Sequence, residues 1–173
     1  MRWTEIGDMH CSIARTLAVL GDRWTLLVLR ELFLRSRRFE EFQAYLGLSS
    51  AILSARLARL VTHGIVRRIR YCEHPPRHEY RLTEKGRDLY PVMVSLIRWG
   101  DRWLAGPDGP PARLVHGTCG REMTPILVCP HCGELVDPRD VRPRLGAVLT
   151  AERADLRRAA GVRRSAARRK AAR

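Results

Sequence analysis

The stretch Leu48 to His63, LSSAILSARLARLVTH, constrains the fold most, because its apolar residues recur at the spacing of one helix face. Ser49 and Ser50, just after Gly47, can accept the unpaired backbone N–H groups at a helix start. Large apolar side chains then follow at i, i+4, i+7 and i+8, as in a helix that buries one stripe. The stripe consists of Leu53, Leu57, Leu60 and Val61.

The other side of this predicted helix is small, polar or cationic, and it carries no acid. Small residues let a helix backbone approach a duplex closely, and arginine reaches phosphates or guanine edges in the major groove. A surface helix whose charges only keep the chain in solution is the alternative interpretation. The side consists of Ala51, Ser54, Ala55, Ala58 and Thr62, flanked by Arg56 and Arg59.

The segments before this helix read as three further helices. Apolar periodicity predicts helices over 13–20, 24–33 and 37–46, with Gly21-Asp22 as a break between the first two. Residues 1–10 show no strong preference. Gly47-Leu48-Ser49 is a short connection between the third helix and the next one, and the second helix of the pair has a basic front. This is the helix-turn-helix arrangement.

A basic hairpin is predicted after this helix pair. Gly64 is the expected helix stop, 65–71 and 78–82 have strand composition, and 73–77 is a turn. A hairpin in this position is a wing whose charges lie beside the DNA backbone or the minor groove; an ordinary hairpin with solvated arginines is the alternative. The basic residues are Arg67, Arg68, Arg70, Arg77 and His78.

The segment after Thr83, its predicted N-cap, has more apolar surface than a terminal helix needs to cover a small domain. Burial against a twin chain is one solution, and a two-fold dimer suits a palindromic DNA site. Packing back onto the central helices is the other, and both can hold for different faces. Pro91 is expected to bend the helix. The heptad-like positions are Leu89, Met93, Leu96, Gly100 and Trp103.

Composition divides the chain into three parts. Residues 1–105 hold the helices and wing, 106–149 a linker and a Cys-rich unit, and 150–173 a basic tail with eight Arg and one Lys. The fold class is therefore mainly α with a small β-wing, plus a zinc-ribbon-like unit and a tail that is flexible or transiently helical. The net charge of +14 attracts polyanions. The tail should add sequence-independent DNA affinity; a solubilising tail is the alternative.

Two half-sites with metal-ligand spacing lie in the Cys-rich unit, nine residues apart. Together they offer one nitrogen and three sulfur ligands, the donor set of a tetrahedral structural Zn²⁺ with no open position. The strand-like segment 124–128 between them fits a zinc-ribbon hairpin. His131 is a competing fourth ligand, and three free cysteines with chance spacing remain the alternative. The predicted ligands are His116, Cys119, Cys129 and Cys132.

Over roughly residues 9–105 the chain resembles the HxlR-type winged helix-turn-helix regulators. The resemblance rests on segments 11–32, 38–66 and 79–89, which contain the motifs GDRWT, LSARL and YRLTEKG. It implies a homodimeric bacterial transcription factor with the first and last helices of the core in the dimer contact. It implies neither a target, nor a ligand, nor the sign of regulation. The family pattern does not require the Cys-rich unit.

Some relatives in this family use the cysteine at the first helix to sense oxidants or electrophiles. Cys11 occupies that position, where a helix start and nearby Arg15 would favour a thiolate; a small packed residue is the alternative. Cys72, next to the wing, is expected to be incidental.

The expected function is a dimeric regulator, a repressor by expectation, that binds double-stranded DNA in the cytoplasm. A small-molecule effector or an oxidant could control it. No nucleophile–base pair, phosphate loop or open metal site is readable, so no enzyme activity is expected. No membrane span or signal peptide is readable either. A zinc-ribbon adaptor that contacts the transcription machinery is the alternative function. The predicted DNA contacts are Ser49, Ser50, Ala51, Ser54, Ala55, Arg56, Arg59, Arg67, Arg68, Arg70, Arg77 and His78.

Overall fold

A computed structural model describes residues 3–171, with side chains described over 5–160. The chain forms two units. Residues 19–135 make up one, and the residues up to 18 together with those from 136 onward make up the other. The division inferred from composition, with boundaries after residues 105 and 149, stays a prediction.

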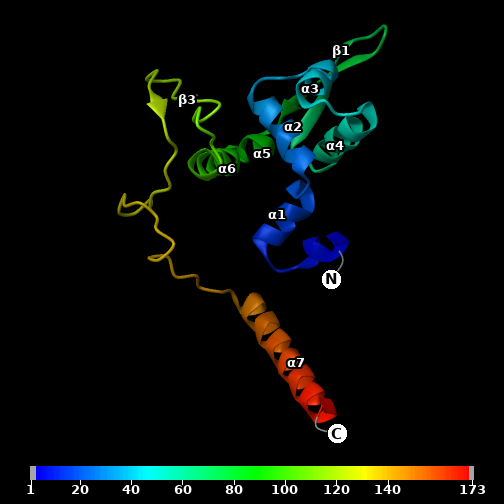
Figure 1. The fold of residues 1–173 in the computed structure, drawn as a ribbon. Coiled ribbons are helices and arrows are strands. Elements are labelled where there is room, and N and C mark those ends of the chain that lie inside the picture. The colour runs from blue at the N-terminus through cyan, green and yellow to red at the C-terminus, as the bar shows by residue number, and fades with distance from the viewer. Residues whose placement is uncertain (1–2, 172–173) are drawn as a thin grey trace. The chain divides into compact units, whose positions relative to one another are not determined.

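The larger unit is helical with a small antiparallel hairpin, which confirms the predicted mainly α class with a wing. Helices α2, α3 and α4 cluster at the base of the hairpin, and the hairpin projects beyond them (Figure 1). The elements are α2 (Arg23–Phe33), α3 (Phe39–Leu46), α4 (Ser50–Thr62), β1 (Val66–Cys72), β2 (Arg77–Leu82), α5 (Glu84–Arg87) and α6 (Tyr90–Trp103).

The hydrophobic core lies where α2, α3 and α4 meet. Val28 and Leu29 of α2 are fully buried, as are Phe42 of α3 and Leu53 of α4. The apolar period of each helix therefore faces one common centre, and α2 is central as the sequence predicts. The first strand adds Val66, which is 2% exposed, to this core.

Helix α3 begins at Phe39 rather than at Arg37, so the predicted start was two residues early. The backbone at Arg38 is extended, and the carbonyl of Arg37 accepts a hydrogen bond of 2.8 Å from Tyr80 N of the hairpin. Glu41 then caps the helix by accepting from the Arg37 and Arg38 backbone N–H groups at 2.7 and 2.9 Å. These hydrogen bonds also hold the pKa of Glu41 below its ordinary value. Pairing with β2 thus overrides the helical pattern.

The helix expected after Thr83 is two helices. Thr83 caps α5 as predicted, since its Oγ1 accepts from Gly86 N at 3.1 Å. The chain then restarts as α6 with Pro91 in the first turn, where its missing N–H costs no helical hydrogen bond. The prediction that Pro91 bends one long helix was therefore wrong.

Gly86 sits where any side chain would collide with the backbone. A Cβ built on Gly86 would lie 2.2 Å from the carbonyl oxygen of Ile65. We expect Gly86→Ala to lower the free energy of unfolding by about 2–3 kcal/mol, because backbone must move to make room. Thermal unfolding should show a melting temperature lower by roughly 5–10 °C. Gly106→Ala is the control, because nothing lies within 4 Å of its added Cβ.

The remaining elements are short, apart from the C-terminal helix. A 3₁₀ helix covers Trp3–Asp8, where no preference was predicted, and α1 covers Ser12–Leu20. Strand β3 (Leu114–Val115) pairs with β4 (Glu122–Met123), and α7 covers Ala147–Ala171. The expected strand over 124–128 was wrong, because only Val128 makes a strand-like bridge, to Leu135.

No helix within the described part of the chain has both the length and the apolar character needed to cross a membrane.

Candidate nucleic-acid interface

The turn between α3 and α4 has helix-turn-helix geometry. Gly47 adopts a left-handed conformation with φ of 62°, and its N–H closes α3 on Gln43 O at 2.9 Å. Ser49 is the N-cap of α4, and Gln43 Nε2 donates to Ser50 Oγ at 3.1 Å. The predicted short connection and the serine cap are both confirmed.

Helix α4 has one buried and one open side. Leu53, Leu57 and Leu60 are at most 1% exposed and anchor the helix in the core. The opposite side is exposed and has no acidic residue along the helix, so a duplex can approach its backbone. We call this side the recognition flank; it consists of Ser50, Ala51, Ser54, Ala55, Ala58 and Thr62.

The two arginines of α4 contact the N-cap of α2 and the last turn of α1. Arg56 Nε lies 2.8 Å from Asp22 Oδ1, as an ion pair without the alignment of a hydrogen bond. Arg59 Nε donates to the carbonyl of Val19 at 3.2 Å. Both arginines are half-buried, so they fix the orientation of α4 as well as its charge.

Asp22 is a residue whose role sequence reasoning missed. It was interpreted only as a helix break, whereas its Oδ1 caps α2 by accepting from Trp24 N and Thr25 N at 3.0 and 3.1 Å. An Asp just before an apolar-periodic run is a recognised capping signal. Its second contact, with Arg56 on α4, has no signal in the sequence.

The wing is an antiparallel hairpin with a basic edge, and its register shifts between Arg70 and Cys72. Arg68 faces Tyr80 and Arg70 faces His78 in the strand register. The Arg68 guanidinium lies 2.9 Å from His78 Nδ1. Loss of hydration, together with the charges of Arg68 and Arg70, holds the pKa of His78 below its ordinary value. The positive charge of the wing therefore resides chiefly on the arginines, and His78 contacts one of them.

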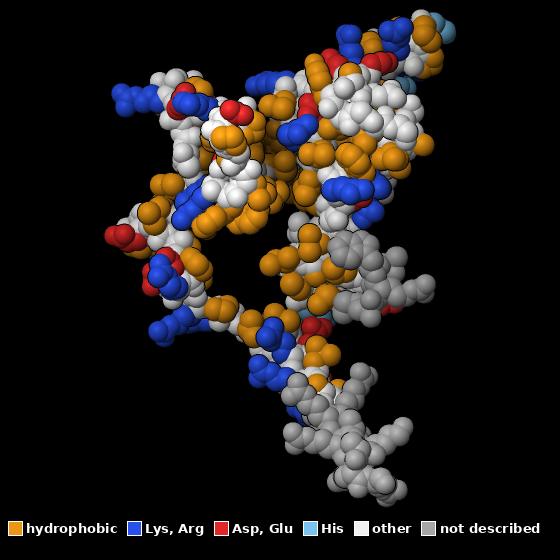
Figure 2. Space-filling model, in the orientation of Figure 1, with side chains coloured by type: hydrophobic (Ala, Val, Ile, Leu, Met, Phe, Trp, Pro, Cys, Tyr) orange, Lys and Arg blue, Asp and Glu red, His pale blue; other side chains and the backbone are white. Residues whose placement is uncertain are grey.

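A groove of about 620 Å³ separates α4 from the wing. It brings Ser54 of the recognition flank to the same opening as Arg68 and Arg77 of the wing. Basic and histidine side chains gather along the projecting hairpin in the space-filling view (Figure 2). The lining comprises Phe39, Glu40, Ser54, Ala58, Val61, Thr62, Arg68, Tyr71, Pro76, Arg77, His78 and Tyr80.

Arg67 lies on the opposite face of the wing from Arg68, because side chains alternate along a strand. It lines a second hollow with four more arginines, Arg35, Arg37, Arg81 and Arg87. The rings of Phe33 and Tyr90, 5.2 Å apart between centroids, form part of the same hollow. The predicted basic residues of the wing are thus divided between two faces.

The four predicted zinc ligands lie in two separate turns. His116 and Cys119 share one turn, and Cys129 and Cys132 share the other. Nowhere among the described residues do three metal-binding side chains meet at one point. Backbone N–H groups of Cys132 and His131 donate to the Cys129 sulfur, and they lower the pKa of that thiol.

Cys11 directly precedes α1 and is half-buried. Arg15 follows it by one helical turn, and its Nε donates to the carbonyl of Met9 at 3.1 Å. Cys72, at the end of β1, is also half-buried, and its thiol lies 3.7 Å from His74 O.

A capped pair of helices with an exposed recognition flank, followed by a basic hairpin, defines a winged helix-turn-helix protein. The chain belongs to the HxlR-like helix-turn-helix family, which matches residues 19–107. The resemblance inferred from the sequence motifs is therefore confirmed.

Relatives and solved structures agree with this family. Rv3095 of Mycobacterium tuberculosis, an uncharacterised HTH-type transcriptional regulator, is 49% identical over 135 residues, which are 78% of this chain and 85% of that protein. PA1607, a candidate transcription factor of known crystal structure, matches with a TM-score of 0.74 and 36% identity, over 83% of this chain and all of that one. The redox regulator HypR in its reduced form matches with a TM-score of 0.51 and 32% identity, over 54% of this chain and 96% of HypR.

Proposed function

We propose that this protein is a sequence-specific DNA-binding transcriptional regulator. The observation that carries the proposal is the recognition flank, which is exposed and free of acidic residues and lies on α4, a helix whose leucines are buried in the core. The flank opens onto the groove that it shares with the wing arginines, so a duplex can meet both elements together. Membership of a family of DNA-binding regulators supports the same proposal.

In this proposal the first turns of α4 meet base edges in the major groove and the wing contacts the backbone. Ser50, Ala51, Ser54 and Ala55 face the bases, with Ser49 at the helix start beside a phosphate. Arg59 and Arg56 orient α4 through their contacts with Val19 and Asp22, and they would exchange these contacts for a base edge and a phosphate when DNA binds. The wing contacts the DNA backbone or the minor groove through Arg67, Arg68, Arg70, Arg77 and His78.

Arg68→Ala should weaken binding to operator and to unrelated DNA similarly, since a phosphate contact carries no sequence information. The slope of log affinity against log salt concentration should fall by about 1. Fluorescence anisotropy across a salt series measures both quantities.

Arg67→Ala is the matched neighbour on the opposite face of the wing. If the groove face is the one that meets DNA, this variant should change the affinity and the salt slope less than Arg68→Ala. Equal affinities and slopes for Arg68→Ala and the unmodified protein would contradict the proposed docking.

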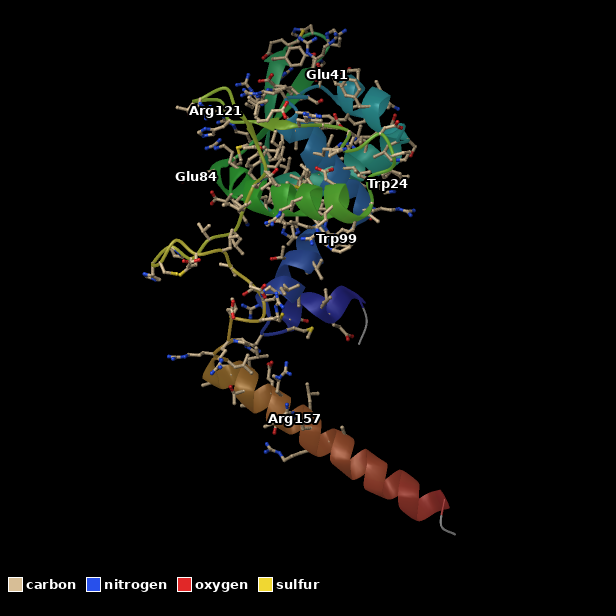
Figure 3. The ribbon with its side chains drawn as sticks, turned by 60° about the vertical axis from the view of Figure 1, so that its left-hand side comes forward. Trp24, Glu41, Glu84, Trp99, Arg121 and Arg157 are labelled. Carbon is tan, nitrogen blue, oxygen red and sulfur yellow. The ribbon has the colours of Figure 1, made fainter. Side chains whose placement is uncertain are left out.

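We further propose that the protein acts as a homodimer on a palindromic site. Large apolar side chains on α6 remain uncovered, with Leu96 at 48%, Trp99 at 58% and Trp103 at 62% exposure. Trp99 projects from α6 away from the α2–α4 core (Figure 3). Met93 and Val94, by contrast, are buried, so the helix uses one face inward and leaves another for a partner.

The proposal extends to the direction of regulation and to the signal that controls it. We propose repression in the cytoplasm, with oxidants or electrophiles as a signal read by Cys11; the redox regulator HypR is a relative of known structure. A small-molecule effector stays a prediction, and the five-arginine hollow beside Phe33 and Tyr90 would suit an anionic one.

Diamide or a quinone should weaken operator binding by the unmodified protein and leave Cys11→Ser unaffected. The physical reason is that Cys11 is half-buried directly before α1, so a group added to its sulfur should disturb the packing of that helix start. Gel shifts before and after treatment measure the effect, with Cys72→Ser as the matched control at another half-buried thiol. Identical responses of Cys11→Ser and the unmodified protein would remove the sensor role.

The adaptor alternative places the function in residues 114–145, with the winged unit as a scaffold. Exposed Ile126, Leu127 and Leu135 give that region an apolar surface for a protein partner. Deletion of 106–173 separates the two: retained operator binding with lost regulation supports an adaptor contribution.

A further inference from the structure

The segment 114–135 contains the same small hairpin turn twice. In the first turn, Gly120 N donates to His116 O at 2.8 Å and His116 N donates to Arg121 O at 2.9 Å. Gly120 has φ of 68°, which favours glycine over residues with a side chain. The turn is therefore closed by its own backbone.

The second turn repeats these bonds position by position. Gly133 N donates to Cys129 O at 2.9 Å, and Cys129 N donates to Glu134 O at 2.8 Å. Gly133 has φ of 76°. In both turns the first candidate ligand stands at the opening position, the second three residues later, and the glycine directly after it.

The strand pairs that flank the turns also correspond. Val115 pairs with Glu122 around the first turn, and Val128 bridges to Leu135 around the second. Each turn is thus the tip of a minimal antiparallel hairpin, with candidate ligands three residues apart at its tip. Two hairpins of one geometry are difficult to attribute to the chance spacing of three cysteines.

The donor atoms of the first turn are already close, since His116 Nδ1 lies 3.4 Å from Cys119 Sγ. Cys129 and Cys132 occupy the same two positions of the second turn. One imidazole nitrogen and three thiolate sulfurs match Zn²⁺, whereas Mg²⁺ and Ca²⁺ prefer oxygen ligands. His131 lies inside the second turn, between its two sulfur ligands.

Apolar residues between and beside the turns are uncovered. Ile126 is 60% exposed and Leu127 and Leu135 are each 65% exposed. So short a segment cannot bury these side chains in a core of its own. Small domains commonly gain the missing stability from a bound metal ion. The seven residues 122–128 between the turns are long enough for the turns to meet.

We propose that one Zn²⁺ joins the two turns through His116, Cys119, Cys129 and Cys132 and closes segment 114–135 into a compact zinc ribbon. Four protein ligands complete a tetrahedral shell, so the ion is structural. Binding converts the three thiols into thiolates and releases their protons to solvent. The proposal does not depend on DNA binding.

The test uses the full-length chain, purified without chelator and then exposed to Zn²⁺. Elemental analysis should give one zinc per chain, and Co²⁺ in its place should give the intense visible absorption of tetrahedral sulfur coordination. Cys132→Ser and Cys129→Ser should each weaken metal affinity by about 100-fold or more, while Cys72→Ser should retain a full equivalent.

His116→Ala and His131→Ala form the matched pair that identifies the nitrogen ligand. The first should lose most of its metal affinity and the second should keep it. The proposal would be overturned by a chain that stays metal-free, by a Cys132→Ser variant that retains full affinity, or by loss in His131→Ala with retention in His116→Ala. Unfolding temperature with and without zinc, measured on all variants, separates loss of the ligand from loss of the fold.

Discussion

Leu96→Glu combined with Trp99→Glu will convert the protein into a monomer and lower operator affinity by about 100-fold or more. The two side chains are 48% and 58% exposed on α6 and belong to an exposed apolar stripe that also contains Val92 and Trp103. Carboxylates there would be desolvated against a twin helix, which strongly disfavours association. A monomer binds only one half-site and loses the gain from linking two binding events, which typically reaches two to four powers of ten.

Size-exclusion chromatography with light scattering gives the oligomeric state, and anisotropy gives the operator affinity. Arg98→Glu is the control, since it places an acid on an exposed position of the same helix off the stripe. Retained dimers and retained affinity in the double variant would exclude α6 as the interface.

Ser54→Glu will lower operator affinity by about 100-fold or more without unfolding the protein. Ser54 is exposed at the centre of the recognition flank and lines the groove toward the wing. A carboxylate there would face the phosphates, and a like charge in an interface costs several kcal/mol. Its added bulk would also hold the helix backbone away from the base edges.

Ala105→Glu makes the same change in net charge at an exposed position just beyond α6, and it should leave affinity nearly unchanged. Circular dichroism should give both variants the helix content of the unmodified protein. Unchanged operator affinity in Ser54→Glu would mean that another surface meets DNA.

The local features of the site were predictable because they depend on short-range patterns. The leucine period of α4 determines which side is buried, and Ser49 and Gly64 mark where the helix begins and where the chain leaves it. The basic hairpin follows from strand composition around a turn.

Features that depend on contacts between distant segments were not predictable in this way. The ion pair between Asp22 and Arg56 joins α2 to α4, and the pairing of Arg37 with Tyr80 decides where α3 begins. Neither contact has a period or a motif in the sequence. The separation of Arg67 from Arg68 follows from strand alternation, yet which face meets α4 depends on how the hairpin packs.

The heptad-like pattern after Thr83 was only partly informative. It predicted a helix with two apolar faces, and α6 has both. Of the predicted positions, Met93 packs inward, whereas Leu96 and Trp103 are exposed in a stripe that they share with Val92 and Trp99. Periodicity alone cannot tell which apolar face a small domain covers when both are available.

The most direct test of the proposed DNA contact is methylation protection of guanine N7 on an operator selected from genomic fragments. N7 lies in the major groove, so a helix inserted there blocks its reaction with dimethyl sulfate. We predict two clusters of protected guanines about one helical turn apart, centre to centre, and loss of both in Ser54→Glu. A tight operator complex with every guanine N7 still reactive would contradict insertion of the recognition flank into the major groove.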